Sequence, residues 1–234
     1  MKALKEQVFR ANLELVKKNL VVLTWGNVSA IDRDKNLVAI KPSGVSYDEM
    51  SVDDIVIVDL EGNIVEGYLN PSSDTATHLQ LYKDFKNIGS VVHTHSQWAT
   101  TLSQSGLSVP CAGTTHADTF YGTVPVTRAM NENETQTEYE LNTAKVIVET
   151  FVNNDINPNE IPAVLVNDHG PFVWGTSASN AVENAIILEE VSKMYYHQVL
   201  IDSLHHGVDQ HLLDKHYLRK HGNNAYYGQK KEDK

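Results

Sequence analysis

The sequence has very little cysteine, and it shows neither a signal peptide nor an apolar segment long enough to cross a membrane. Its 234 residues contain one cysteine, Cys111, which excludes an internal disulfide and fits a reducing compartment. Residues 1–20 carry charged side chains where a secretory signal would have an apolar core. No apolar run approaches the length that crosses a membrane. We therefore expect a soluble protein of the cytoplasm with no membrane partner.

Basic residues are also in the minority. The chain has 19 Lys and Arg against 30 Asp and Glu, which gives a formal net charge of −11 at pH 7. This balance argues against nucleic-acid binding, because phosphate backbones attract basic surfaces. Neither Gly-x-Gly-x-x-Gly nor a P-loop occurs, which removes the usual nucleotide-binding hypotheses. A small anionic substrate stays compatible with the charge, since a site can be locally positive in an acidic protein.

Short β-rich segments and helical segments follow one another along the chain. Strands are expected over residues 21–25, 27–31, 37–41, 55–60, 64–65, 90–95, 163–167 and 171–174, and near residue 109. Helices are expected from the N-terminus to about residue 20, and over 72–85, 96–104, 138–152, 179–200 and 210–221. The sequence has no repeat and no long linker, so one α/β domain over residues 1–234 is predicted. Its sheet should be largely antiparallel or mixed, with helices on both faces.

The most informative stretch reads Ser-Val-Val-His-Thr-His over residues 90–95. In a strand, alternate side chains leave the same face, so His93 and His95 would lie close enough to share a metal ion. With eleven histidines in the chain, a chance surface or core pair is the alternative. Asp74, behind a pair of serines, and His169, in a Gly-Pro loop, add further candidate ligands. A catalytic zinc site uses three or four such nitrogen and oxygen ligands.

Three loops are suited to holding an anion. They are Gly26-Asn27 after a strand, Ser43-Gly44 after Lys41-Pro42, and Ser72-Ser73 at a helix start. Small residues allow close approach of the backbone, hydroxyls donate hydrogen bonds, and a helix N-terminus offers free N–H groups. Each loop alone is more often a simple turn or cap. Three of them beside a candidate metal site suggest a phosphorylated substrate.

Two further features could carry chemistry. Asp118 ends the Gly/Thr-rich segment 113–118 and could donate or accept a proton, with a turn or cap role as the alternative. Tyr226 and Tyr227 lie near the end of the chain, in a segment that would ordinarily be disordered. Paired aromatic residues at such a position suggest that the tail docks, and a site is one place where it could do so.

Seven strings occur in an order that resembles the class II aldolase/adducin-like family, over essentially the whole chain. They are TWGNVS (24–29), KPSGV (41–45), PSSDT (71–75), HTHS (93–96), GTTHAD (113–118), DHGPF (168–172) and KHYLRKHG (215–222). The resemblance implies a three-layer α/β/α fold and one metal ion, normally Zn²⁺. The ligands that it implies are Asp74, His93, His95 and His169.

The resemblance also implies the remaining site residues. Substrate contacts, mainly to phosphate, would come from Gly26, Asn27, Ser43, Gly44, Ser72 and Ser73. Asp118 and Tyr227 would be the acid/base pair. The family is generally homotetrameric with sites at subunit interfaces. The C-terminal helix and tail, about residues 205–234, are therefore expected to help form the neighbouring subunit's site.

The activity that the resemblance implies is epimerisation at C4, interconverting L-ribulose 5-phosphate and D-xylulose 5-phosphate, as in arabinose catabolism. The C4 hydroxyl is β to the C2 carbonyl, which permits retro-aldol cleavage of the C3–C4 bond through an enediolate that a metal stabilises. The alternative is a class II sugar-phosphate aldolase of the fuculose or rhamnulose phosphate type. Such aldolases typically carry Glu where this chain has Asp74. A non-catalytic adducin-like module and a zinc hydrolase explain fewer of these residues.

Overall fold

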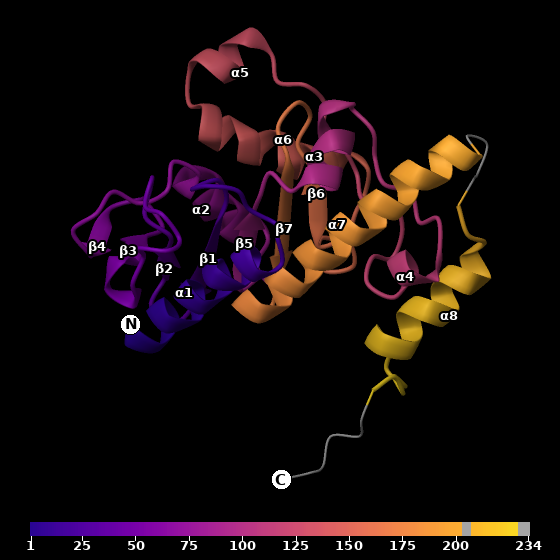
Figure 1. Cartoon of the computed structure of the whole chain (residues 1–234), viewed down its shortest axis with the longest axis horizontal. Helices are drawn as coiled ribbons and strands as arrows, with labels where there is room; N and C mark the ends of the chain where they lie inside the picture. Colours follow the sequence, from indigo (N-terminus) through magenta and orange to yellow (C-terminus); the bar gives the residue numbers. More distant parts are fainter. Residues whose placement is uncertain (203–206, 229–234) are drawn as a thin grey trace.

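A central antiparallel sheet organises the part of the chain that the computed structural model describes, residues 1–202 and 207–228 (Figure 1). Its strands are β1 (Asn27–Asp32), β2 (Leu37–Ile40), β3 (Val56–Asp59), β4 (Ile64–Glu66), β5 (Ser90–His93), β6 (Ala163–Leu165) and β7 (Pro171–Gly175). The order across the sheet is β4-β3-β2-β1-β5-β7-β6, and each neighbouring pair is antiparallel. The predicted largely antiparallel sheet is confirmed.

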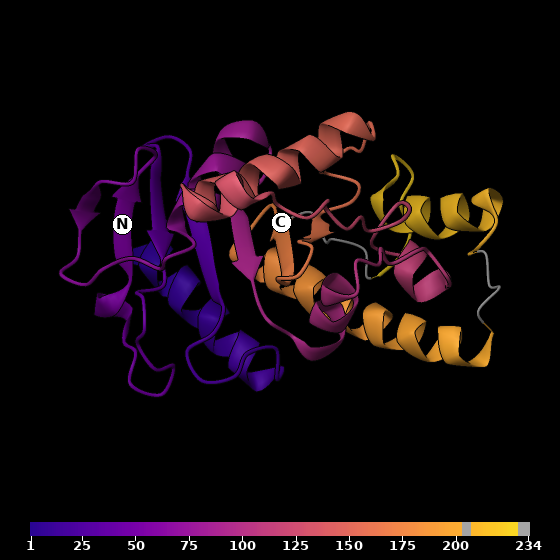
Figure 2. The ribbon, with the colours of Figure 1, turned by 90° about the horizontal axis from the view of Figure 1, so that it is seen from above.

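Helices cover both faces of this sheet. They are α1 (Lys2–Lys17), α2 (Thr75–Asp84), α3 (Gln97–Gln104), α4 (Thr114–Ala117), α5 (Glu132–Gln136), α6 (Tyr139–Asn153), α7 (Ala178–Ile201) and α8 (Gln210–His221), with a 3₁₀ turn at Val52–Asp54. Figure 2 shows α6 on one side of the sheet, with α1 and α7 on the other. None of the described helices is long and apolar enough to cross a membrane.

The two faces of the sheet pack into two hydrophobic clusters. In β5, Val92 belongs to the cluster shared with α1 and α7, whereas Val91 belongs to the cluster shared with α2 and α6. Residues of β3 divide in the same way, with Ile57 in the first cluster and Val56 in the second. Successive side chains of a strand point to opposite faces, so a sheet covered on both sides needs apolar residues at nearly every position. This requirement explains the continuous Val and Ile runs of the central strands.

Three expected strands differ from the structure. Residues 21–25 form a turn rather than a strand, because Leu23 has φ +55°, outside the extended region. The expected strand over 90–95 ends at His93. Near Val109 there is an isolated bridge to Val124 in place of a strand. The short helix α5 was not predicted, although its Asn131-x-x-Glu134 capping box is a sequence signal for a helix start.

The C-terminal helix matches its expected range and packs against α4. Beyond it, the backbone N–H groups of Tyr226 and Tyr227 donate to the carbonyl of Arg219 at 3.0 and 3.1 Å. Both tyrosine side chains are exposed, so the expectation that this pair docks over a site stays a prediction. Within the expected segment 205–234, residues 205–206 and 229–234 lie outside the described part of the chain.

Candidate metal centre and substrate pocket

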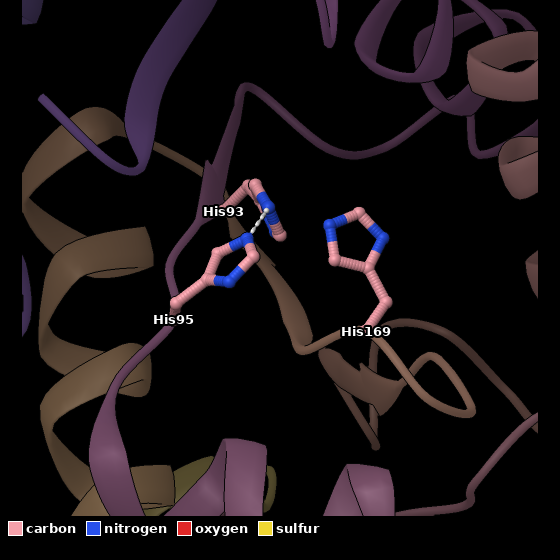
Figure 3. Close-up of side chains that lie close together, drawn as sticks. All are labelled: His93, His95 and His169. Carbon is pink, nitrogen blue, oxygen red and sulfur yellow. Dashed lines mark hydrogen bonds between the residues drawn. The ribbon is translucent and has the colours of Figure 1, made fainter.

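Three histidine side chains converge at one end of the sheet (Figure 3). His93, His95 and His169 each offer one ring nitrogen to a group whose members all lie within 4.8 Å of one another. The Nε2 atoms of His93 and His95 are 3.1 Å apart. Ring centroids of His169 lie 4.7 Å from His93 and 5.0 Å from His95. Three imidazole nitrogens facing a common space form a donor set suited to a divalent transition metal.

His93 and His95 lie at and just beyond the end of β5. His93 is the last residue of β5, paired with Asn27 of β1 and with Phe172 of β7. His95 lies two residues further along, just beyond the end of the strand, and Thr94 N between them still donates to Pro171 O at 3.4 Å. The rings of His93 and His95 lie close together, as the spacing of the two histidines predicted (Figure 3).

His169 is positioned by the turn between β6 and β7. Its backbone N–H donates to Val166 O at 3.0 Å, and Asp168 adopts φ +59° within the turn. At the next position a Cβ on Gly170 would lie 2.8 Å from Thr94 O, closer than real contacts allow. A glycine is therefore required for the turn to lie against the segment that carries His93 and His95.

The contacts of the rings orient their nitrogens. His93 Nδ1 donates to Pro171 O at 3.0 Å, which leaves the lone pair on Nε2, and its ring stacks on Phe172 at 4.2 Å. Tyr139 OH lies 3.3 Å from His169 Nδ1. A metal-binding histidine commonly donates its second ring N–H to a backbone carbonyl, as His93 does to Pro171 O. Burial lowers the pKa of His169 to about 3 and also lowers the pKa of His95. These two rings are thus neutral at pH 7, the form that binds metal.

Asp74 lies beside the histidines at the start of α2. Its side chain makes no cap hydrogen bond to the helix. It accepts instead a 2.6 Å hydrogen bond from Asn27 Nδ2. Burial raises the pKa of Asp74, but the nearby His93 and His78 and the Asn27 hydrogen bond outweigh it, and the net pKa is below the usual value. An ionised carboxylate therefore faces the same space, although it is not one of the three groups whose ligand atoms converge.

A pocket of about 600 Å³ joins these groups to the predicted anion-binding loops. Its lining includes Gly26, Asn27, Ser43, Gly44, Ser72, Ser73, Asp74, His93, His95 and His169. At Gly26, φ is +81° and a Cβ would lie 2.8 Å from His93 O, so this loop needs glycine to approach β5. The volume is within the range of small-molecule sites. One pocket thus gathers all ten residues expected to bind metal or substrate.

The pocket lining also contains residues that the sequence did not single out. Lys41, Tyr139 and Glu140 all line it. Lys41 Nζ donates to Val45 O at 2.8 Å, and burial lowers the pKa of this lysine to about 8. In the sequence, Lys41 could have been found from its place directly before Pro42-Ser43-Gly44. Its ammonium group makes the pocket locally positive in an otherwise acidic protein. No comparable sequence signal marked Tyr139 and Glu140, which begin α6.

Asp118 and Tyr227 lie together but are not among the residues that line this pocket. Asp118 accepts from Arg219 Nη2 at 2.7 Å and from His216 Nδ1 at 3.0 Å. Its burial raises the pKa, but the Arg219 and His216 hydrogen bonds outweigh this and the net pKa is lowered. The Tyr227 ring lies 5.0 Å from Arg219 Cζ and 4.6 Å from Lys220 Nζ. Asp118, at the end of α4, and Tyr227 thus both contact basic residues of α8. Helices α4 and α8 lie side by side in Figures 1 and 2.

Residues 6–196 match the family model described as Class II Aldolase and Adducin N-terminal domain. The chain belongs to this family. Class II aldolases are metal-dependent, and the three converging histidines could hold a metal ion. The likeness stated on the seven sequence strings is confirmed.

Relatives of this class II aldolase family member are similar over their whole length. The chain is 54% identical over 230 residues to a protein described as L-ribulose-5-phosphate 4-epimerase UlaF from Salmonella paratyphi C (strain RKS4594), covering 98% of this chain and 100% of that one. The same values hold for the UlaF protein of Salmonella choleraesuis (strain SC-B67).

Solved structures of the family share the fold. An L-fuculose 1-phosphate aldolase has a TM-score of 0.77 at 27% identity, over 92% of this chain and 94% of that chain. The YgbL protein of Escherichia coli has a TM-score of 0.72 at 23% identity, over 92% of this chain and 97% of that chain. The second likeness supports the fold alone.

Proposed function

We propose that this class II aldolase family member is an isomerase that interconverts L-ribulose 5-phosphate and D-xylulose 5-phosphate by epimerisation at C4. The observation that carries the proposal is the 54% identity to an L-ribulose-5-phosphate 4-epimerase over 100% of that protein's length. The pocket supports it, since histidines suited to a metal and loops suited to a phosphate face one space. The role we propose is a cytoplasmic one in pentose metabolism such as arabinose catabolism.

His93, His95 and His169, with Asp74 as a fourth ligand, would hold one Zn²⁺ in this pocket. The neutral rings and the ionised carboxylate support this assignment, as does the hydrogen bond that orients His93. When bound, a divalent metal supplies Lewis-acid stabilisation of negative charge on substrate oxygens. Asn27 would keep the Asp74 carboxylate in place through its 2.6 Å hydrogen bond.

The phosphate would lie against Gly26-Asn27, Ser43-Gly44 and Ser72-Ser73. These residues line the pocket together with Lys41, whose ammonium group adds positive charge. A held phosphate matters for this reaction because cleavage of the C3–C4 bond makes two fragments from one substrate. An enzyme that epimerises must keep the aldehyde fragment bound while it rotates and presents its other face.

Asp118 and Tyr227 would exchange the proton of the C4 hydroxyl. One group would remove it as the C3–C4 bond breaks, and the other would return a proton when the bond forms again on the opposite face. Both groups lie outside the pocket lining of their own chain. The proposal therefore includes a homotetramer with sites at subunit interfaces, in which α8 and the tail complete the neighbouring pocket.

A class II sugar-phosphate aldolase is the second candidate. The TM-score of 0.77 to an L-fuculose 1-phosphate aldolase, at 27% identity, favours it. The two candidates are separated by offering purified protein each sugar phosphate in turn. The proposed function predicts D-xylulose 5-phosphate from L-ribulose 5-phosphate and little cleavage of L-fuculose 1-phosphate. Rapid cleavage of the fuculose ester, with no pentulose epimer formed, would favour the aldolase.

A further inference from the structure

Helix α3 connects two of the segments that carry histidines. It begins at Gln97, and only its N-cap residue Ser96 separates it from His95. Near its other end, the Ser103 hydroxyl donates to Val166 O, and Asp168 N donates to Ser103 O at 3.3 Å. Val166 and Asp168 belong to the turn that carries His169. The placement of α3 therefore sets where His95 and the His169 turn lie relative to one another.

The start of α3 depends on a residue that is distant in sequence. Ser96 occupies the N-cap position but makes no side-chain cap hydrogen bond. Glu189 of α7 supplies the acceptors instead: its Oε1 accepts from Trp98 N and its Oε2 from Ala99 N, both at 2.9 Å. The first N–H groups of a helix have no partner within the helix and carry its positive dipole end, which a carboxylate stabilises.

The geometry of this cap restricts the helix strongly. Glu189 is 8% exposed, and each of its two carboxylate oxygens accepts one backbone N–H. The side chain comes from α7, which packs against both α3 and β7. Two hydrogen bonds from one planar group fix the direction as well as the position of the helix start. Glu189 is not among the residues that line the pocket, and its two hydrogen bonds connect it to the segment of His95 through the start of α3.

We infer that Glu189 is a positioning residue, which sets the spacing of His95 and His169 for the metal by fixing the start of α3. The inference rests on the proposed function, because it assumes that these histidines bind a metal ion. Metal affinity depends on ligand distances within a few tenths of an ångström. A small displacement of α3 would move His95 and the His169 turn at the same time.

The test compares Glu189→Gln with the wild type in full-length, metal-free protein. The amide keeps the size of the side chain but replaces one of the two acceptor oxygens with a donor. Zinc affinity, measured by competition with a chromophoric chelator, is expected to fall about tenfold. The visible absorption of the Co²⁺-loaded variant is expected to change, because that spectrum reports ligand geometry. Neither readout depends on activity.

Ser177→Ala is the matched control, because it also removes a helix cap. Ser177 Oγ accepts from Asn180 N at 3.2 Å at the start of α7, away from the metal pocket. This variant is expected to lose stability while keeping wild-type zinc affinity and Co²⁺ spectrum. If Glu189→Gln behaves like Ser177→Ala, losing stability alone, the inference is wrong.

Ser103→Ala provides a second test at the other end of α3, and it decides the question if Glu189→Gln does not fold. It removes the hydroxyl that donates to Val166 O and should also weaken zinc binding. Unchanged zinc affinity in this variant would contradict the connecting role of α3. Wild-type protein that binds no zinc would contradict the proposed function, and this inference with it. Wild-type binding with no effect of either substitution would contradict the inference alone.

Discussion

The Asp74 side chain accepts a 2.6 Å hydrogen bond from Asn27 and makes no cap hydrogen bond to the helix that it begins. We propose that the length of this side chain decides between epimerisation and cleavage, because a short carboxylate held by Asn27 would not reach the cleaved fragment to protonate it. Asp74→Glu adds one methylene and should let the carboxyl group reach the fragment and protonate it. We expect a larger share of released dihydroxyacetone and glycolaldehyde phosphate from L-ribulose 5-phosphate, measured by enzymatic assay of both.

The matched variant is Asp74→Asn, which keeps the length and the ability to accept from Asn27 but lacks the charge. It should lose activity without releasing fragments. Equal partitioning between cleavage and epimerisation in Asp74→Glu and the wild type would refute the role given to side-chain length.

His116 makes the stability of the fold depend on pH. Burial lowers its pKa to about 4 from 6.5, partly offset by its 2.7 Å hydrogen bond to Gly122 O. Between pH 6.5 and 4, His116 is protonated in the unfolded chain but stays neutral in the folded chain. Stability is therefore lost as the pH falls from 6.5 to 4, by up to about 3 kcal/mol for this residue. His116→Gln keeps a donor for Gly122 O and should show a shallower loss in urea unfolding of metal-free protein.

Other buried histidines titrate in the same window, so the difference between wild type and His116→Gln is the informative quantity. The pKa of His78 is also lowered by burial, to about 3. A variant whose unfolding free energy falls as steeply as that of the wild type between pH 6.5 and 4 would show that His116 carries no such penalty.

At the scale of elements, the turn between β6 and β7 can lie against the His93–His95 segment only because Gly170 has no side chain. A Cβ there would lie 2.8 Å from Thr94 O. We expect Gly170→Ala to destabilise the fold by about 1–3 kcal/mol and to weaken zinc binding, since relief of the clash moves His169. Gly113→Ala is the control, because nothing lies within 4 Å of its added Cβ. The checks are thermal unfolding and competition for zinc. Equal losses of stability and of zinc affinity in Gly170→Ala and Gly113→Ala would contradict this account of the turn.

The sequence predicted elements best where apolar residues are buried on both faces of the sheet. The runs of β1, β2 and β7 and the periodic pattern of α7 agree with the structure within a few residues. It failed where the backbone conformation opposes the apolar pattern, as at Leu23 with φ +55°. His93 and His95 were expected to lie together, and their ring nitrogens do converge, although β5 ends at His93.

At the scale of the whole molecule, the roles proposed for Asp118 and Tyr227 predict that each site needs a second copy of the chain. Each proposed site would combine the pocket of one subunit with the α4 and α8 residues of another. Variants His95→Asn and Asp118→Asn should each be inactive as pure proteins. Mixed after unfolding and refolding, they should regain about a quarter of wild-type activity, because a random pairing supplies both intact halves at about one interface in four.

The control mixes His95→Asn with His169→Asn, which impair the same pocket and should not complement each other. No recovery from the first mixture, in oligomers shown by mass to contain both chains, would contradict sites shared between subunits. The sequence could not settle this point, because a single chain carries no signal for which surfaces meet. The acid/base roles of Asp118 and Tyr227 came from the family resemblance, and the structure adds that both residues contact Arg219.

The most direct measurement follows L-ribulose 5-phosphate to D-xylulose 5-phosphate with protein stripped of metal and then reloaded with Zn²⁺. The account predicts conversion by the reloaded wild type, little by the stripped protein, and none by His95→Asn after the same reloading. Conversion that persists after complete metal removal, or no D-xylulose 5-phosphate from the zinc-loaded wild type, would contradict a metal-dependent C4 epimerase.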